Sequence, residues 1–212
     1  VRDCTSAELA ARVGVHLELG RARRALAECA GKVEEKNLQL KDAYEQMETM
    51  ARIDLLTNLP NRQYMLERLR DEAARAYRRQ YAFTVIMAAV DDFPAVERAF
   101  GRDGADYVLQ AVAGLLKAGR RGQDVVARWE KAQFILMLPE TYLPDGGRVA
   151  ERIRARVESA AIDCGGQTAR VTMTLGVAEF APDCGGIEAA IEKARAAMAG
   201  SGATNSVALS RK

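Results

Sequence analysis

The stretch Asp54-Leu-Leu-Thr-Asn-Leu-Pro-Asn-Arg62 decides the fold of this chain of 212 residues. Its Leu-Pro-Asn end introduces a helical run from Asn61 to Arg79, since proline and asparagine are typical of helix starts. The apolar block Phe83–Val90 follows and has the composition of a buried strand, and Asp103–Lys117 is helical again. This alternation of helices and strands predicts an α/β domain.

The remaining sequence continues the alternation. Two apolar segments, Val125–Ala127 and Phe134–Leu138, flank the polar turn Trp129–Gln133, which predicts a hairpin with Glu130-Lys-Ala-Gln133 at its tip. After this hairpin we expect a helix, a strand, a helix and a closing strand, over Asp145–Val157, Val171–Glu179, Ile187–Met198 and Ser206–Leu209. Asp163–Gly166 and Asp183–Gly186 share the letters Asp-Cys-Gly-Gly and are interpreted as two similar turns.

A heptad pattern precedes the domain. An apolar residue recurs at every seventh position, namely at Leu19, Leu26, Val33, Leu40 and Met47. Such spacing is typical of a coiled-coil seam, and an asparagine at the flanking seam position, Asn37, favours two parallel strands. We therefore expect residues 19–52 to form a coiled-coil linker that holds a homodimer, with a solvated single helix as the alternative.

The residues before the heptad pattern give a weaker indication of their structure. Residues 6–19 resemble the last helix of a response-regulator receiver domain, but too few residues precede the linker to form a receiver. We expect residues 1–18 to be the remnant of such a helix in a fragment of a longer protein. The predicted organisation is this remnant over 1–18, the linker over 19–52, and one domain over 53–212.

Composition excludes several classes of function. The formal net charge is only +2, which gives no electrostatic reason to expect nucleic acid or an anionic membrane as partner. The apolar stretches are far shorter than the roughly 20 residues of a membrane span. The four cysteines are scattered and His16 is the only histidine, so no zinc site is expected. We expect a cytoplasmic protein with no metal and no resident cofactor.

The stretch that starts at Asp54 resembles the opening signature of GGDEF domains, the diguanylate cyclase family. Further blocks match the family in order and spacing: Val90–Phe93, Gly101, Asp106–Leu109, Asp124–Arg128 and Val171–Ala178. The resemblance implies an α/β (α+β) fold with a central, mostly antiparallel sheet wrapped by helices, related to nucleotide-cyclase and polymerase palms. It also implies a place in bacterial cyclic di-GMP signalling.

The resemblance also identifies departures from the catalytic pattern. Active members hold two Mg²⁺ on carboxylates, and those two positions fall here on Ala89 and Ala132, whose methyl groups cannot bind a metal. The signature Gly-Gly-Asp/Glu-Glu-Phe is written Glu130-Lys-Ala-Gln-Phe134, and the long side chains in place of glycines are expected to block nucleotide entry. From these departures we expect a domain that is not an enzyme.

Further positions at which the family contacts the nucleotide also carry different residues in this sequence. The guanine-reading asparagine falls on Glu97, its neighbouring aspartate on Arg98 and a phosphate-contacting lysine on Pro94, while Asp106 keeps the other guanine contact. Near the C-terminus, the stretch 199–205 lacks both of the family's phosphate-binding cations.

The sequence keeps the motif of a second site of the family, which binds the product cyclic di-GMP. The motif Arg-x-x-Asp, which marks an inhibitory site for cyclic di-GMP, is present as Arg121-Gly-Gln-Asp124, and Arg152 on a later helix completes it. Arginine and aspartate suit guanine and phosphate groups as hydrogen-bonding partners. We therefore predict a cyclic di-GMP receptor that signals to a protein partner. The alternative is a ligand-independent dimeric scaffold, in which Arg121 and Asp124 form an ordinary exposed turn.

Overall fold

The computed structural model describes residues 52–182 and 185–210, together with residues 23, 26, 28, 30–37, 39 and 41. The chain divides into two compact units, residues 1–50 and 51–212. Each unit is described by itself.

The described residues of the N-terminal unit are helical and exposed. Two seam positions lie among them, Leu26 at 73% exposed and Val33 at 54%. The other three apolar seam positions and the predicted receiver remnant, residues 1–18, lie outside the described residues. Coiled-coil pairing therefore stays a prediction.

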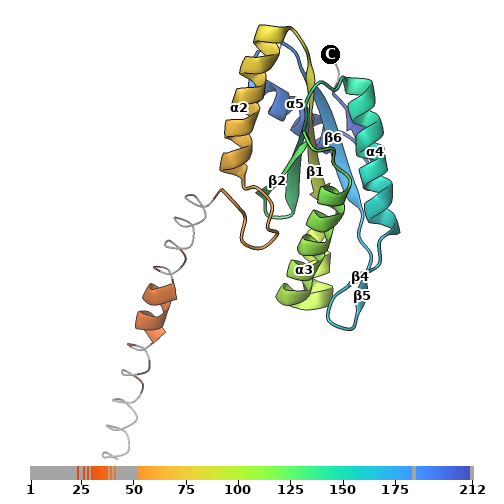
Figure 1. Ribbon diagram of the computed structural model, residues 1–212. Coiled ribbons are helices and arrows are strands. Elements are labelled where there is room, and N and C mark those ends of the chain that lie inside the picture. The colour runs from red at the N-terminus through yellow and green to blue at the C-terminus, as the bar shows by residue number, and fades with distance from the viewer. Residues whose placement is uncertain are drawn as a thin grey trace, which may run out of the picture. The chain divides into compact units, whose positions relative to one another are not determined.

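A five-stranded sheet forms the centre of the second unit, in the order β2-β3-β1-β6-β7 (Figure 1). All neighbouring strands are antiparallel except β6 and β7, which are parallel. The central strand β1 is buried on both faces, as its continuous apolar sequence predicts. The strands span Phe83–Val90 (β1), Val125–Glu130 (β2), Gln133–Leu138 (β3), Met173–Phe180 (β6) and Val207–Leu209 (β7).

Helices cover both faces of the sheet (Figure 1). Alternate residues of β1 divide between two cores: Ile86 and Ala88 pack with α3 and α4, while Val85 and Met87 pack with α2 and α5. Asn61 caps α2 by accepting a hydrogen bond from the amide of Tyr64 at 3.0 Å. The helices span Arg62–Arg79 (α2), Phe93–Ala118 (α3), Leu143–Ser159 (α4) and Ile187–Ala199 (α5).

The predicted α/β (α+β) class with a mostly antiparallel sheet is confirmed, with differences at element ends. α3 begins at Phe93, ten residues before the predicted start at Asp103, and it contains a break at Gly101, where φ is 70°. Because proline and glycine usually interrupt helices, Pro94 and Gly101 made this first part of the helix hard to predict from hydrophobic periodicity. The hairpin β4–β5, Ile162–Asp163 and Thr168–Ala169, was not predicted because its strands have only two residues each.

The turn that begins with Asp54 is tied to the β2–β3 hairpin. The Asp54 carboxylate accepts hydrogen bonds from the amide and hydroxyl of Thr57, at 2.7 and 2.5 Å. Arg128 Nη1 lies 3.2 Å from both oxygens of the same carboxylate. The Arg128 guanidinium also donates to the carbonyl of Lys131 at the hairpin tip, at 2.8 and 3.0 Å. One arginine therefore joins the start of the domain to the tip of the hairpin.

None of the helices in the described part of the chain combines the length and apolarity that crossing a membrane requires.

Replacing Gly176 by alanine should lower the free energy of unfolding by about 3 kcal/mol, because overpacking against a rigid neighbour is destabilising. A Cβ at Gly176 in β6 would collide with backbone atoms of Ala194 and Met198 in or beside α5. The matched control is Gly114→Ala in α3, where nothing lies within 4 Å of the added carbon. That variant should gain about 0.5–1 kcal/mol from helix propensity. Urea unfolding compares the two, and equal stabilities would contradict this packing.

The pKa of Tyr81 is raised to about 12, mainly by burial and then by its hydrogen bond to Glu72, whose Oε1 lies 2.7 Å from the phenol. A raised pKa favours the protonated phenol in the folded state, so its contribution to stability is complete below pH 10 and is lost between about pH 10 and 12. Tyr81→Phe should make the alkaline loss of stability in this range shallower. Unfolding measured at several pH values checks this, with Tyr107→Phe as the control.

Candidate functional site

A hollow of about 770 Å³ opens where β1 ends, beside the β2–β3 hairpin. The amide of Val90 donates to the carbonyl of Ala132 at 3.1 Å, so the end of β1 and the hairpin tip are held together. The structure thus brings together the residues at the family's nucleotide-binding positions. Its lining includes Ala89, Pro94, Glu97, Asp106, Lys131 and Ala132.

The residues present do not fit a two-metal centre. Ala89 and Ala132, at the two expected ligand positions, carry only methyl groups, and Ala132 is buried at 7% exposed. Among the described residues, no group of three or more histidines, cysteines or acidic residues is arranged to hold a metal ion. We derive no reaction step through a metal at this site.

Asp91, which directly follows β1, is held by hydrogen bonds within the fold. Its Oδ2 accepts hydrogen bonds from the hydroxyl of Thr172 at 2.6 Å and from the amide of Asn205 at 2.8 Å. Its Oδ1 accepts from the hydroxyl of Thr174 at 2.6 Å. Asp91 therefore joins β1, β6 and the loop before β7, rather than facing the hollow.

That the long side chains in place of the glycines block nucleotide entry stays a prediction, although the hollow itself is open. Lys131 adopts a left-handed backbone conformation with φ of 46° in the two-residue turn of the hairpin, and its side chain is exposed. Glu97 is also exposed, at the edge of the hollow, and Asp106 is half-buried. Glu97, Asp106 and Lys131 therefore line the hollow without filling it.

The Arg121–Asp124 turn is built around a buried carboxylate. Asp124 is 5% exposed, and its Oδ2 accepts the amide hydrogen of Arg121 at 2.7 Å. Its own amide donates to the carbonyl of Arg121 at 3.1 Å, and its carbonyl accepts from Arg120 Nη1 at 3.0 Å. Asp124 thus stabilises the loop that presents Arg121 to solvent.

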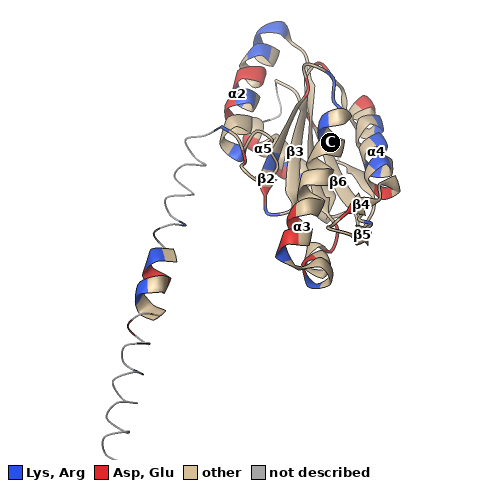
Figure 2. Cartoon of the chain, turned by 60° about the horizontal axis from the view of Figure 1, so that its bottom comes forward, with Lys and Arg blue, Asp and Glu red and all other residues tan. Residues whose placement is uncertain are grey.

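Arg121 and Arg152 line one hollow of about 230 Å³, which also includes Arg148 at the start of α4. Figure 2 shows lysine and arginine residues along α4. Arg152 makes one long hydrogen bond, 3.5 Å to the carbonyl of Gly119, so most of its donors face solvent. The structure therefore brings together two of the three predicted ligand residues, Arg121 and Arg152, while Asp124 lines a separate cleft.

Arg154, the next arginine on α4, makes hydrogen bonds and ion pairs within the protein instead of lining this hollow. It donates to Glu151 and Glu158 at 2.6 and 2.8 Å, and to the side chain of Asn205 at 2.8 Å. These hydrogen bonds from Arg154 hold the pKa of both glutamates below its usual range and raise the pKa of Arg154 itself. Arg154 connects α4 to the loop before β7, which leaves Arg152 as the available guanidinium of the pair.

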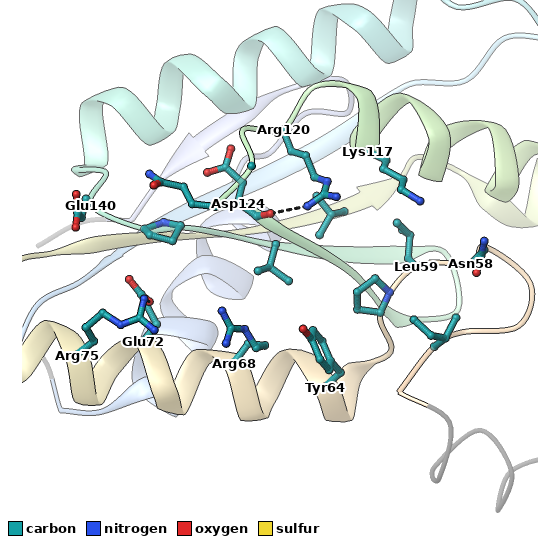
Figure 3. Close-up of a pocket in the computed structure, with 17 residues that line it drawn as sticks. Asn58, Leu59, Tyr64, Arg68, Glu72, Arg75, Lys117, Arg120, Asp124 and Glu140 are labelled. Carbon is teal, nitrogen blue, oxygen red and sulfur yellow. Dashed lines mark hydrogen bonds and ion pairs between the residues drawn. The ribbon is translucent and has the colours of Figure 1, made fainter.

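Sequence reasoning missed a second cleft, the α2–α3 cleft, which has a volume of about 570 Å³. It lies between α2, the 53–60 turn, the C-terminal end of α3 and the start of β2 (Figure 3). The available signal was a pair of basic clusters. Arg68 and Arg75 are seven residues apart and lie on one side of α2, and Lys117 near the end of α3 is followed three residues later by Arg120 in the loop. These four cations all line the cleft.

Comparisons with known proteins agree with this geometry. The family described as "Diguanylate cyclase, GGDEF domain" matches residues 51–206. Diguanylate cyclase DgcP of Pseudomonas aeruginosa is 31% identical over 175 residues, which cover 82% of this chain and 26% of that protein. This chain spans less than half the length of the curated relatives it matches.

Two solved structures resemble the chain over most of its length. Diguanylate cyclase SiaD, in complex with its activator SiaC from Pseudomonas aeruginosa, has a TM-score of 0.71 and 29% identity, covering 97% of this chain and 79% of that chain. The coiled coil and GGDEF domain of DgcB from Caulobacter crescentus, in complex with c-di-GMP, has a TM-score of 0.71 and 25% identity. That match covers 89% of this chain and 99% of the chain in that structure.

These relatives contradict our prediction that the chain is not an enzyme. DgcP and SiaD are both named diguanylate cyclases, and so is a further relative from Treponema denticola. The prediction relied on the alanines at positions 89 and 132, on the long side chains at positions 130 and 131, and on the further departures at positions 94, 97 and 98 and in the stretch 199–205. Substitutions at these positions do not by themselves establish that activity is absent, and the prediction is corrected accordingly.

The fold and the match together show the family. The sheet order, the two helical layers and the structural neighbours confirm the predicted palm-like α+β fold. The matched stretch, residues 51–206, covers well over half of the chain and begins just before Asp54. This chain belongs to the diguanylate cyclase GGDEF domain family.

Proposed function

We propose that this GGDEF domain is a receptor for cyclic di-GMP, which binds at the Arg121–Asp124 turn and Arg152. The observation that carries the proposal is that Arg121, from the loop before β2, and Arg152, from α4, line the same hollow. Their positions differ by 31 residues in the sequence, so the fold alone brings these two guanidinium groups to one place.

The chemistry of these side chains suits the ligand. A guanidinium donates paired hydrogen bonds either to guanine O6 and N7 or to a phosphate. Arg121 is exposed, and the buried Asp124 fixes the backbone from which it extends. Since Asp124 Oδ2 already accepts from the amide of Arg121, its main contribution is to position Arg121. The DgcB structure, which was solved with c-di-GMP, supports this ligand for a domain of this family.

Cyclic di-GMP should bind the 212-residue chain, and Arg121→Ala should weaken binding at least about tenfold, since a bidentate arginine contact is worth roughly 1–3 kcal/mol. Arg152→Ala should have a similar effect, because both residues line the hollow. Isothermal titration measures both variants. Arg170→Ala is the control, because Arg170 is exposed and lies outside this hollow.

Unchanged affinity after Arg121→Ala would overturn the assignment of the site. A flat titration of the unaltered chain would instead favour a ligand-independent dimeric scaffold. Incubation with GTP and Mg²⁺, followed by chromatography of the products, measures turnover directly in the same preparations. The receptor proposal requires binding with or without turnover, so these two measurements are independent.

We also propose that the chain forms a homodimer through a coiled coil over residues 19–52, in a cytoplasmic signalling protein with an upstream input domain and a protein partner. The exposed Leu26 and Val33 support the pairing, because apolar side chains at heptad spacing are stabilised by burial against a partner. The DgcB structure contains a coiled coil together with its GGDEF domain.

Val33→Asp should shift the chain from dimer to monomer at micromolar concentration, because a charge at the seam opposes burial. Glu34→Gln is the control, since Glu34 is the next residue along the helix and does not belong to the apolar seam. Sedimentation velocity measures the mass of each species. A dimer that persists in Val33→Asp, or a monomer in the unaltered chain, would contradict the coiled coil.

A further inference from the structure

We propose that the α2–α3 cleft binds the phosphate group of a nucleotide, held by Arg68, Lys117 and Arg120. The cleft shares only Glu140 with the lining of the Arg121–Arg152 hollow, and it lies on the other side of the Arg121–Asp124 turn, where it is lined by Gly122, Gln123 and Asp124. Its volume of about 570 Å³ lies within the range of roughly 300–1,000 Å³ that is typical of small-molecule sites.

Two of the three acidic residues in the cleft have hydrogen-bond partners within the protein, and one of these two, Glu72, is paired with a cation. Glu72 is buried and accepts from the Tyr81 hydroxyl at 2.7 Å and from Arg75 Nη1 at 3.0 Å. Asp124 accepts the amide hydrogen of Arg121. Glu140 is the third acid and is exposed at the edge of the cleft. Because Arg75 pairs with Glu72, three cations remain, Arg68, Lys117 and Arg120, against the two carboxylates of Asp124 and Glu140. The cleft therefore keeps an excess of one positive charge.

Donors of these three cations are available to a ligand. The Nε atom of Arg68 is buried and has no hydrogen-bond partner within the described part of the chain, and its Nη1 lies 3.9 Å from Asp71 Oδ2. Arg120 uses Nη1 for the carbonyl of Asp124. Lys117 is exposed and makes no hydrogen bond to any described residue. A buried donor without an acceptor is unfavourable, and a phosphate oxygen would supply the acceptor.

The arrangement places the cations on two sides of one space. Arg68 extends from α2, while Lys117 and Arg120 extend from the opposite side, at the end of α3 (Figure 3). A phosphate between them would receive donors from both sides.

Tyr64 lies next to Arg68 along the α2 side of the cleft and offers an aromatic ring (Figure 3). The Arg52 guanidinium lies 5.8 Å from its centroid. An aromatic face and an apolar wall suit a base, because bases stack on aromatic rings. The apolar wall consists of Leu59, Pro60, Val125, Val126 and Pro139.

Three probes test the site by amide chemical shifts on the 212-residue chain, without divalent metal: pyrophosphate, ADP and adenosine. Pyrophosphate should shift the amides of Gly122, Gln123 and Tyr64, ADP should do so at lower concentration, and adenosine should have little effect. Lys117→Gln/Arg120→Gln should weaken ADP binding at least about tenfold, since each charge-assisted contact contributes about that factor. Arg68→Gln should weaken it as well, without touching the Arg121–Asp124 turn.

The matched control is Arg170→Gln/Lys193→Gln, which removes one arginine and one lysine from exposed positions outside the cleft. An equal loss in this control, no response to pyrophosphate or ADP at millimolar concentration, or shifts confined to Ala132 and Gln133 at the other hollow would each overturn the proposal. Arg121→Ala/Arg152→Ala separates the two proposed sites: it should abolish cyclic di-GMP binding and leave ADP binding unchanged.

Discussion

The ion pair between Asp54 and Arg128 is the constraint on which the rest of the domain depends. Its side chains are only 10% and 16% exposed, so the pair is held in a partly dehydrated place where electrostatic attraction is stronger than in water. Asp54 closes the turn at which the domain begins, and Arg128 reaches the carbonyl of Lys131 at the tip of the hairpin. Arg128 therefore holds the first turn of the domain directly to the hairpin beside the larger hollow.

Much of the fold could be predicted from the sequence because its signals are local. The boundaries of β1 follow from an uninterrupted apolar block, and the start of α2 follows from Asn61, whose side chain caps the helix. The missed features depend on tertiary contacts. The first turns of α3 precede a break at Gly101, and the two-residue strands β4 and β5 are too short for any periodicity to be detected.

The candidate site was predictable in its residues but not in its geometry. The positions of Ala89 and Ala132 in the motifs placed them together, and a backbone hydrogen bond between Val90 and Ala132 confirms that placement. The role of Asp91 could not be read from the motif, because its three partners come from Thr172, Thr174 and Asn205, which lie more than 80 residues away in the chain. Nor does a motif state whether the remaining side chains fill or line a hollow.

The Arg121–Asp124 turn shows why charge must be counted pair by pair. The chain's net charge of +2 suggests no preference for anions, yet this turn separates two hollows that both carry available guanidinium groups. The acids near it are occupied: Asp124 by the amide of Arg121, and Glu72 by Tyr81 and Arg75. Glu72 and Arg75 cancel each other, and the cations that remain in the α2–α3 cleft outnumber the carboxylates of Asp124 and Glu140. A nearly neutral chain therefore still presents a locally basic surface around a single turn.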